Sequence, residues 1–120
     1  MTKAFITGLS GPELTVAERR FLASEQPAGL ILFARNIVEP TQVRRLVSEA
    51  LGAVGAEALV LIDQEGGRVQ RLRPPHWRAL PPARAYATCH AVDPARAVAA
   101  ARIVSRLVAS DLRALGITMN

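Results

Sequence analysis

Short apolar runs that alternate with helix-forming segments constrain the fold of this 120-residue chain most strongly. The runs are apolar throughout instead of alternating in polarity, as expected for strands that helices cover on both faces. Strands alternating with helices favour right-handed crossovers and a parallel sheet. The sequence therefore predicts an α/β fold with strands at Ala4 to Gly8, Gly29 to Phe33, Ala58 to Asp63 and Ile117 to Asn120.

Three segments between these runs carry the signals of helix ends. Thr15-Val16-Ala17-Glu18 is a capping box, which predicts a helix running to about Gln26. Pro40 suits the first turn of a second helix. Asp93-Pro94 combines a cap with a first-turn proline, and Gly116 is expected to end the third helix. The predicted order is β-α-β-α-β, then a long loop, then α-β.

Composition excludes several classes of function. The net charge is +5, but the basic residues are spread along the chain without interleaved aromatics, so a solvated helix surface is favoured over nucleic-acid binding. No apolar run approaches the roughly 20 residues of a membrane span, and the N-terminus turns polar too early for a signal peptide. The single cysteine, Cys89, fits a reducing cytoplasm and is interpreted as a passive thiol.

The run from Leu59 to Arg71 carries the strongest indication of a binding site. An apolar stretch ends abruptly at Asp63, and an amide, a second acid, two glycines and two arginines follow. Such a run is typical of a buried parallel strand that delivers polar groups to its carboxyl end. In α/β folds, that end of the sheet is where ligands bind.

Each residue of this run has two interpretations on spacing alone. Asp63 can accept hydrogen bonds from neighbouring hydroxyls or bind a metal, or it can cap a turn or pair with Arg68. Arg71 can return over the same pocket and donate in a fork, or it can lie exposed in a loop. Gly66-Gly67 permits close approach to a ligand, although a plain turn is favoured for the pair alone.

No complete catalytic set emerges from the remaining candidates. In a continued strand, Asp63 and Glu65 would lie roughly 7 Å apart, within the range of an inverting glycosidase. Two neighbours on one strand approach from one side, however, and cannot flank a scissile bond. His76 and His90 lack partners at metal-ligand spacing. Trp77 is interpreted as pinning the proline-rich loop from Arg73 to Pro82 at the rim of the site, in preference to stacking on a sugar.

Two blocks resemble a known family, Gly29 to Asn36 and Leu61 to Arg71. They are similar to the N-terminal barrel of glycoside hydrolase family 3, in particular to the bacterial β-N-acetylglucosaminidases of peptidoglycan recycling. The Pro74 to Trp77 loop, the Asp93-Pro94 helix and the ending Ala114 to Asn120 resemble it as well. The resemblance implies that residues 1–120 form the first four βα units of a TIM-type (β/α)8 barrel, an incomplete domain.

The resemblance also implies an activity. Family members of this kind are retaining exo-hydrolases that remove terminal β-linked N-acetylglucosamine from muropeptide fragments carrying anhydro-N-acetylmuramic acid. It assigns to Asp63 and Arg71 the binding of hydroxyls on the non-reducing sugar. Glu65, Gly66 and Gly67 belong to the same motif and are expected to shape the pocket.

The family's catalytic groups are expected elsewhere. Its nucleophilic aspartate and its His-Asp acid/base pair correspond to positions beyond Asn120. We therefore expect residues 1–120 alone to be inactive. The complete protein is expected to be a cytoplasmic monomer without cofactor or metal. The alternative is a non-catalytic sugar-binding or structural remnant of the same fold. The sequence leaves open the exact substrate range and the choice between hydrolysis and phosphorolysis.

Overall fold

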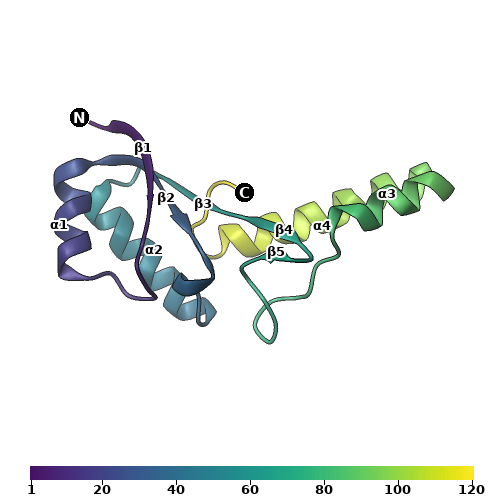
Figure 1. The fold of residues 1–120 in the computed structure, drawn as a ribbon, viewed down its shortest axis with the longest axis horizontal. Helices are drawn as coiled ribbons and strands as arrows, with labels where there is room; N and C mark the ends of the chain where they lie inside the picture. Colours follow the sequence, from purple (N-terminus) through teal and green to yellow (C-terminus); the bar gives the residue numbers. More distant parts are fainter.

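The computed structural model describes all of residues 1–120. Figure 1 shows the arrangement of its strands and helices. In chain order the elements are β1 (Lys3–Gly8), α1 (Val16–Glu25), β2 (Pro27–Leu32), a single 3₁₀ turn (Ala34–Asn36), α2 (Pro40–Val54), β3 (Leu59–Ile62), β4 (Gln64–Gly66), β5 (Val69–Gln70), α3 (Ala83–Val92) and α4 (Pro94–Arg113).

The main sheet is parallel, as the apolar runs predict. Its strand order is β1-β2-β3, and β2 and β3 align so that Leu32 pairs with Ile62. The predicted strand from Ile117 to Asn120 is present only as a parallel bridge between Leu61 and Met119. The α/β class is confirmed, and the predicted fourth strand of the sheet is reduced to this bridge.

The predicted helix ends are confirmed in atomic detail. In the capping box of α1, Thr15 Oγ1 accepts from the Glu18 amide at 3.1 Å, and Glu18 Oε2 accepts from the Thr15 amide at 2.9 Å. Burial raises the pKa of Glu18, but hydrogen bonds from Thr15 and Ser10 outweigh that effect and lower the pKa to about 2. Asp93 caps α4, and Gly116 follows that helix with a φ of +79°.

Three elements, β4, β5 and α3, are additions to the predicted order. A hairpin of β4 and β5 follows β3 directly, and α3 occupies part of what the sequence predicts as a long loop. The hairpin strands have three and two residues, too few for a periodic pattern to be recognised. Helix α3 has no side-chain cap and no buried residue, so it lacks both signals that identify helices in sequence.

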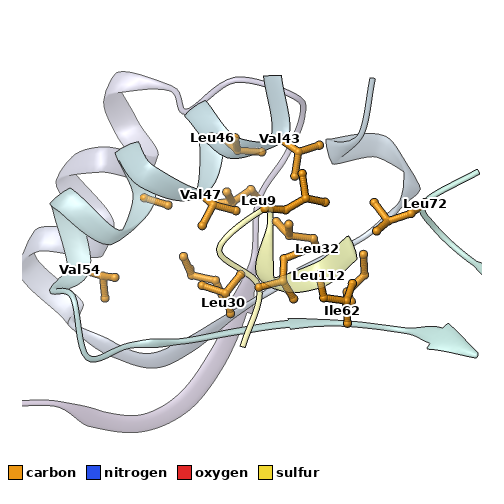
Figure 2. Close-up of a cluster of buried hydrophobic side chains, with 14 of the residues drawn as sticks. Leu9, Leu30, Leu32, Val43, Leu46, Val47, Val54, Ile62, Leu72 and Leu112 are labelled. Atoms are coloured by element: carbon orange, nitrogen blue, oxygen red, sulfur yellow. The ribbon is translucent and has the colours of Figure 1, made fainter. Parts of the chain in front are cut away.

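The hydrophobic core lies between α2 and the parallel sheet (Figure 2). The buried side chains of α2 lie there, together with Leu30 and Leu32 of β2 and Val60 and Ile62 of β3. Ile31 and Leu61 on the other face are only half-buried, so the expectation that both faces of the strands are covered is wrong. Leu112, near the end of α4, joins the same cluster, which fixes the end of that helix against the sheet. The core members labelled in Figure 2 are Leu9, Leu30, Leu32, Val43, Leu46, Val47, Val54, Ile62, Leu72 and Leu112.

The molecule is elongated because α3 and the adjoining part of α4 extend away from this core (Figure 1). Its dimensions are 53 × 30 × 20 Å, and its radius of gyration is 16.3 Å. A compact chain of this length has a radius of gyration of about 13.6 Å. No helix has the length and apolar character needed to cross a membrane.

Candidate functional site

The polar cluster forms where β2 and β3 end. Because these neighbouring strands are parallel and paired at Leu32 and Ile62, the residues that follow them leave the sheet side by side. Those residues are Phe33 and Asp63. Arg71 directly follows β5, and the hairpin folds it back so that its Nη2 donates to Asp63 Oδ2 at 3.2 Å. The structure thus brings Asp63 and Arg71 together, while Arg68 lies exposed.

The contact between Asp63 and Arg71 leaves hydrogen-bonding capacity unused. Only one hydrogen bond joins the two side chains, which are 40% and 23% exposed respectively. Asp63 Oδ1 makes no hydrogen bond within the protein, and the buried Arg71 Nε has no partner. A carboxylate oxygen that accepts and a guanidinium that donates are the complementary groups that adjacent hydroxyls of a sugar require.

Phe33 contacts two arginines. The guanidinium carbon of Arg71 lies 5.9 Å from the centroid of its ring, and that of Arg35 lies 4.6 Å away. Arg35 Nε in turn donates to the carbonyl of Leu9 at 2.8 Å, in the segment that follows β1. These contacts connect the ends of all three parallel strands.

Asn36 fixes the turn after β2. It is completely buried, and its Nδ2 donates to the carbonyls of Leu9 at 3.0 Å and Gly11 at 2.8 Å. Its Oδ1 accepts from the Phe33 amide at 2.9 Å. The roles of Phe33, Arg35 and Asn36 are not predicted from the sequence. For Arg35 and Asn36, the one sequence signal of such a role is that they are polar residues shortly after an apolar strand.

Gln64 holds the backbone of Arg71 in place. Its Oε1 accepts from the amides of Arg71 at 2.9 Å and Leu72 at 3.0 Å, and its Nε2 donates to the Leu72 carbonyl at 3.0 Å. The Gln64 amide itself donates to Asn120 Oδ1 at 2.8 Å. The buried amide side chain of Gln64 therefore fixes the backbone position from which the Arg71 side chain extends.

Gln70 attaches the proline-rich segment to the hairpin. Its Nε2 donates to the carbonyls of Leu72 at 2.7 Å and Arg78 at 2.8 Å, and its Oε1 accepts from the Leu80 amide at 3.0 Å. Trp77 is half-buried and packs against the core, as expected for a residue that pins the loop. The loop is thus held at both the hairpin and the core.

The two glycines of the hairpin turn make room for this same segment. Gly66 has a φ of +94° and Gly67 a φ of +61°. A Cβ on Gly66 would lie 2.3 Å from the carbonyl oxygen of Pro81, and one on Gly67 would lie 2.9 Å from the Cβ of Pro82. The turn interpretation of the pair is confirmed, and any influence of these glycines on a pocket is exerted through the loop they contact.

Asp63 and Glu65 face different surroundings. Glu65 is exposed and contributes to a hollow of about 500 Å³ between the hairpin and α4, to which Asp63 does not contribute. The two carboxylates therefore do not share one pocket, in agreement with the geometric argument against a catalytic pair. No three His, Cys, Asp or Glu side chains gather in a way that could hold a metal ion.

Comparisons with known proteins agree on one family. Residues 5–120 match the model of the glycosyl hydrolase family 3 N terminal domain. The chain is 41% identical over 115 residues to a beta-hexosaminidase of Xanthomonas euvesicatoria. This alignment covers 96% of the chain and 34% of that protein. A beta-hexosaminidase of Stenotrophomonas maltophilia is 38% identical over the same length.

Solved structures show the same relationship. Native NagZ from Neisseria gonorrhoeae superposes with a TM-score of 0.88 at 30% identity, over 97% of this chain and 34% of that one. The complex of that protein with N-trifluoroacetyl-D-glucosamine gives a TM-score of 0.90 over the same shares. The chain therefore spans about a third of the length of the relatives it matches.

Proposed function

This chain belongs to glycosyl hydrolase family 3, and from that premise we propose that it forms the first part of a β-N-acetylhexosaminidase. The match over residues 5–120 confirms the resemblance seen in the sequence, and the solved relatives confirm the α/β fold of a TIM-type barrel. We further propose that residues 1–120 are an incomplete N-terminal part of that barrel domain.

The observation that carries this proposal is the pairing of Asp63 with Arg71 at the carboxyl ends of the strands. Asp63 Oδ1 is free to accept a hydrogen bond from one hydroxyl of a sugar, while the guanidinium donates to another. Charged hydrogen bonds of this kind contribute roughly 1.5–3 kcal/mol each. The relative crystallised with N-trifluoroacetyl-D-glucosamine supports an N-acylated glucosamine as the ligand.

The proposed substrate is a terminal non-reducing β-linked N-acetylglucosamine, attached to a muropeptide fragment that carries anhydro-N-acetylmuramic acid. The proposed mechanism is retaining, which needs a nucleophilic carboxylate and an acid/base group on opposite sides of the bond, about 5–5.5 Å apart. Asp63 and Arg71 bind and orient the sugar. The two catalytic groups belong to the two-thirds of a family member that this chain does not span. The single cysteine supports a cytoplasmic location.

The experiment uses a complete enzyme. This enzyme is the full product of the reading frame that encodes the chain. If that frame stops at Asn120, the enzyme is a chimera in which the chain replaces the matching third of the Xanthomonas euvesicatoria relative. We expect hydrolysis of 4-nitrophenyl N-acetyl-β-D-glucosaminide with the β-anomer as first product. A folded complete enzyme that binds N-acetylglucosamine without hydrolysing it would contradict the proposal and support the non-catalytic alternative.

A further inference from the structure

The side chain of Arg71 has too few hydrogen bonds to account for its position. Its Nε is buried without a partner, and a single hydrogen bond of 3.2 Å joins its guanidinium to Asp63. A long side chain held at one point keeps much of its rotamer freedom. A residue that binds a sugar through a fixed donor geometry needs a second constraint.

The aromatic ring of Phe33 is in a position to supply that constraint. The guanidinium carbon of Arg71 lies 5.9 Å from the ring centroid, within the range of a cation–π contact. The planar guanidinium can pack against an aromatic ring without using its N–H groups for hydrogen bonds. The ring therefore restricts the rotation of Arg71 and leaves its donors free for a ligand.

Phe33 is itself held by Arg35 and Asn36. Arg35 lies 4.6 Å from the ring centroid and is attached to the Leu9 carbonyl at 2.8 Å. The Phe33 amide donates to the buried Asn36. Gly8 leaves the space for this arrangement, since a Cβ there would lie 3.1 Å from Arg35 Nη2 and 3.4 Å from the Phe33 ring.

We propose that Phe33, held by Arg35, is a positioning residue that orients Arg71 toward the sugar. This inference rests on the proposed function and deepens it, because it assigns a role in substrate binding to an aromatic side chain that acts through Arg71. The effect is expected in KM and not in kcat, since Arg71 binds the sugar and takes no part in bond breaking.

The test is a double-mutant cycle in the complete enzyme with 4-nitrophenyl N-acetyl-β-D-glucosaminide. Phe33→Leu removes the ring but keeps an apolar side chain, and we expect KM to rise about tenfold with kcat changed less than about twofold. Phe33→Tyr keeps the ring and is expected to restore KM. In an Arg71→Met background, Phe33→Leu is expected to change kcat/KM by less than about twofold, because no guanidinium remains to be oriented.

Arg35→Met provides a second variant at an exposed position, so the test does not depend on Phe33→Leu folding. We expect a rise in KM of about threefold that also disappears in the Arg71→Met background. Equal losses with and without Arg71, or no loss, would overturn the inference. If Arg71→Met itself leaves kcat/KM unchanged, the proposed function of the site fails instead, so the two failures are distinguishable.

Discussion

Asp63 and Arg71 differ sharply in burial and hydrogen bonding from Gln64 and Gln70, although Gln64 directly follows Asp63 and Gln70 directly precedes Arg71. The two glutamines are 5% and 4% exposed, and each side chain makes three hydrogen bonds to the backbone of the hairpin and its loop. The side chains of Asp63 and Arg71 are 40% and 23% exposed, and they share a single hydrogen bond. Satisfied buried amides stabilise the fold, whereas charged groups with unused hydrogen-bonding capacity mark where a ligand binds.

The largest expected effect separates the ligand-binding pair from the scaffold. Asp63→Ala in the complete enzyme should lower kcat/KM by about 100-fold, equivalent to about 3 kcal/mol of lost charged hydrogen bonding. The midpoint of thermal unfolding should stay close to that of the unsubstituted enzyme, because Asp63 is only half-buried. Steady-state kinetics together with a thermal melt measure both quantities. Activity within about twofold of the unsubstituted enzyme would refute the binding role.

Gly66→Ala should show the reverse pattern, with a loss of stability. The added Cβ would lie 2.3 Å from the Pro81 carbonyl oxygen at a φ of +94°, so the turn and the loop must separate. We expect the free energy of unfolding to fall by about 2–3 kcal/mol, as measured by denaturant titration. Gly52→Ala is the matched control in α2, where nothing lies within 4 Å, and it should stabilise by about 0.5–1 kcal/mol. Similar outcomes for both glycines would contradict the close contact.

Gln64→Leu tests whether the scaffold acts on the site. The substitution leaves the amides of Arg71 and Leu72 without their acceptor, and we expect a loss of about 2 kcal/mol in unfolding free energy. Because Gln64 also fixes the backbone of Arg71, KM should rise by about three- to tenfold while kcat is retained. A destabilised variant with an unchanged KM would show that the position of Arg71 does not depend on this amide.

The smallest effect is expected in the capping box of α1. The pKa of Glu18 is lowered from 4.5 to about 2, so its carboxylate stabilises the fold above pH 4.5 and this contribution is lost as the pH falls toward 2. Glu18→Gln should therefore cost about 1 kcal/mol at pH 7. The difference between the two proteins should vanish near pH 2. A difference that is constant across this pH range would contradict the ionised hydrogen bonds.

The sequence predicts those parts of the molecule whose signals are local. The capping box of α1 needs only Thr15 and Glu18, and the apolar runs identify β2 and β3 although only one face of these strands packs into the core. Helix α3 is missed because it buries nothing and has no side-chain cap. The strand predicted from Ile117 to Asn120 is present only as the bridge between Met119 and Leu61.

The site is less predictable than the fold because its contacts join distant segments. The spacing of Asp63 and Arg71 does not show whether they lie close together. Their contact depends on the hairpin of β4 and β5, which has only five strand residues and folds Arg71 back toward Asp63. The roles of Arg35 and Asn36 depend on the carbonyl of Leu9, more than 25 residues earlier in the chain. Gln64 and Gln70 are polar residues in a polar segment, and nothing in the sequence distinguishes them as buried.

Asp63 and Arg71 are proposed to hold the sugar, while Gln64 and Gln70 hold the hairpin and its loop. The most direct test is the dissociation constant of N-acetyl-D-glucosamine, measured by calorimetry for the complete enzyme and for its Asp63→Ala variant. We predict that binding weakens by about 30-fold or more, the equivalent of at least one charged hydrogen bond. An unchanged dissociation constant in a folded variant would show that Asp63 does not bind the sugar.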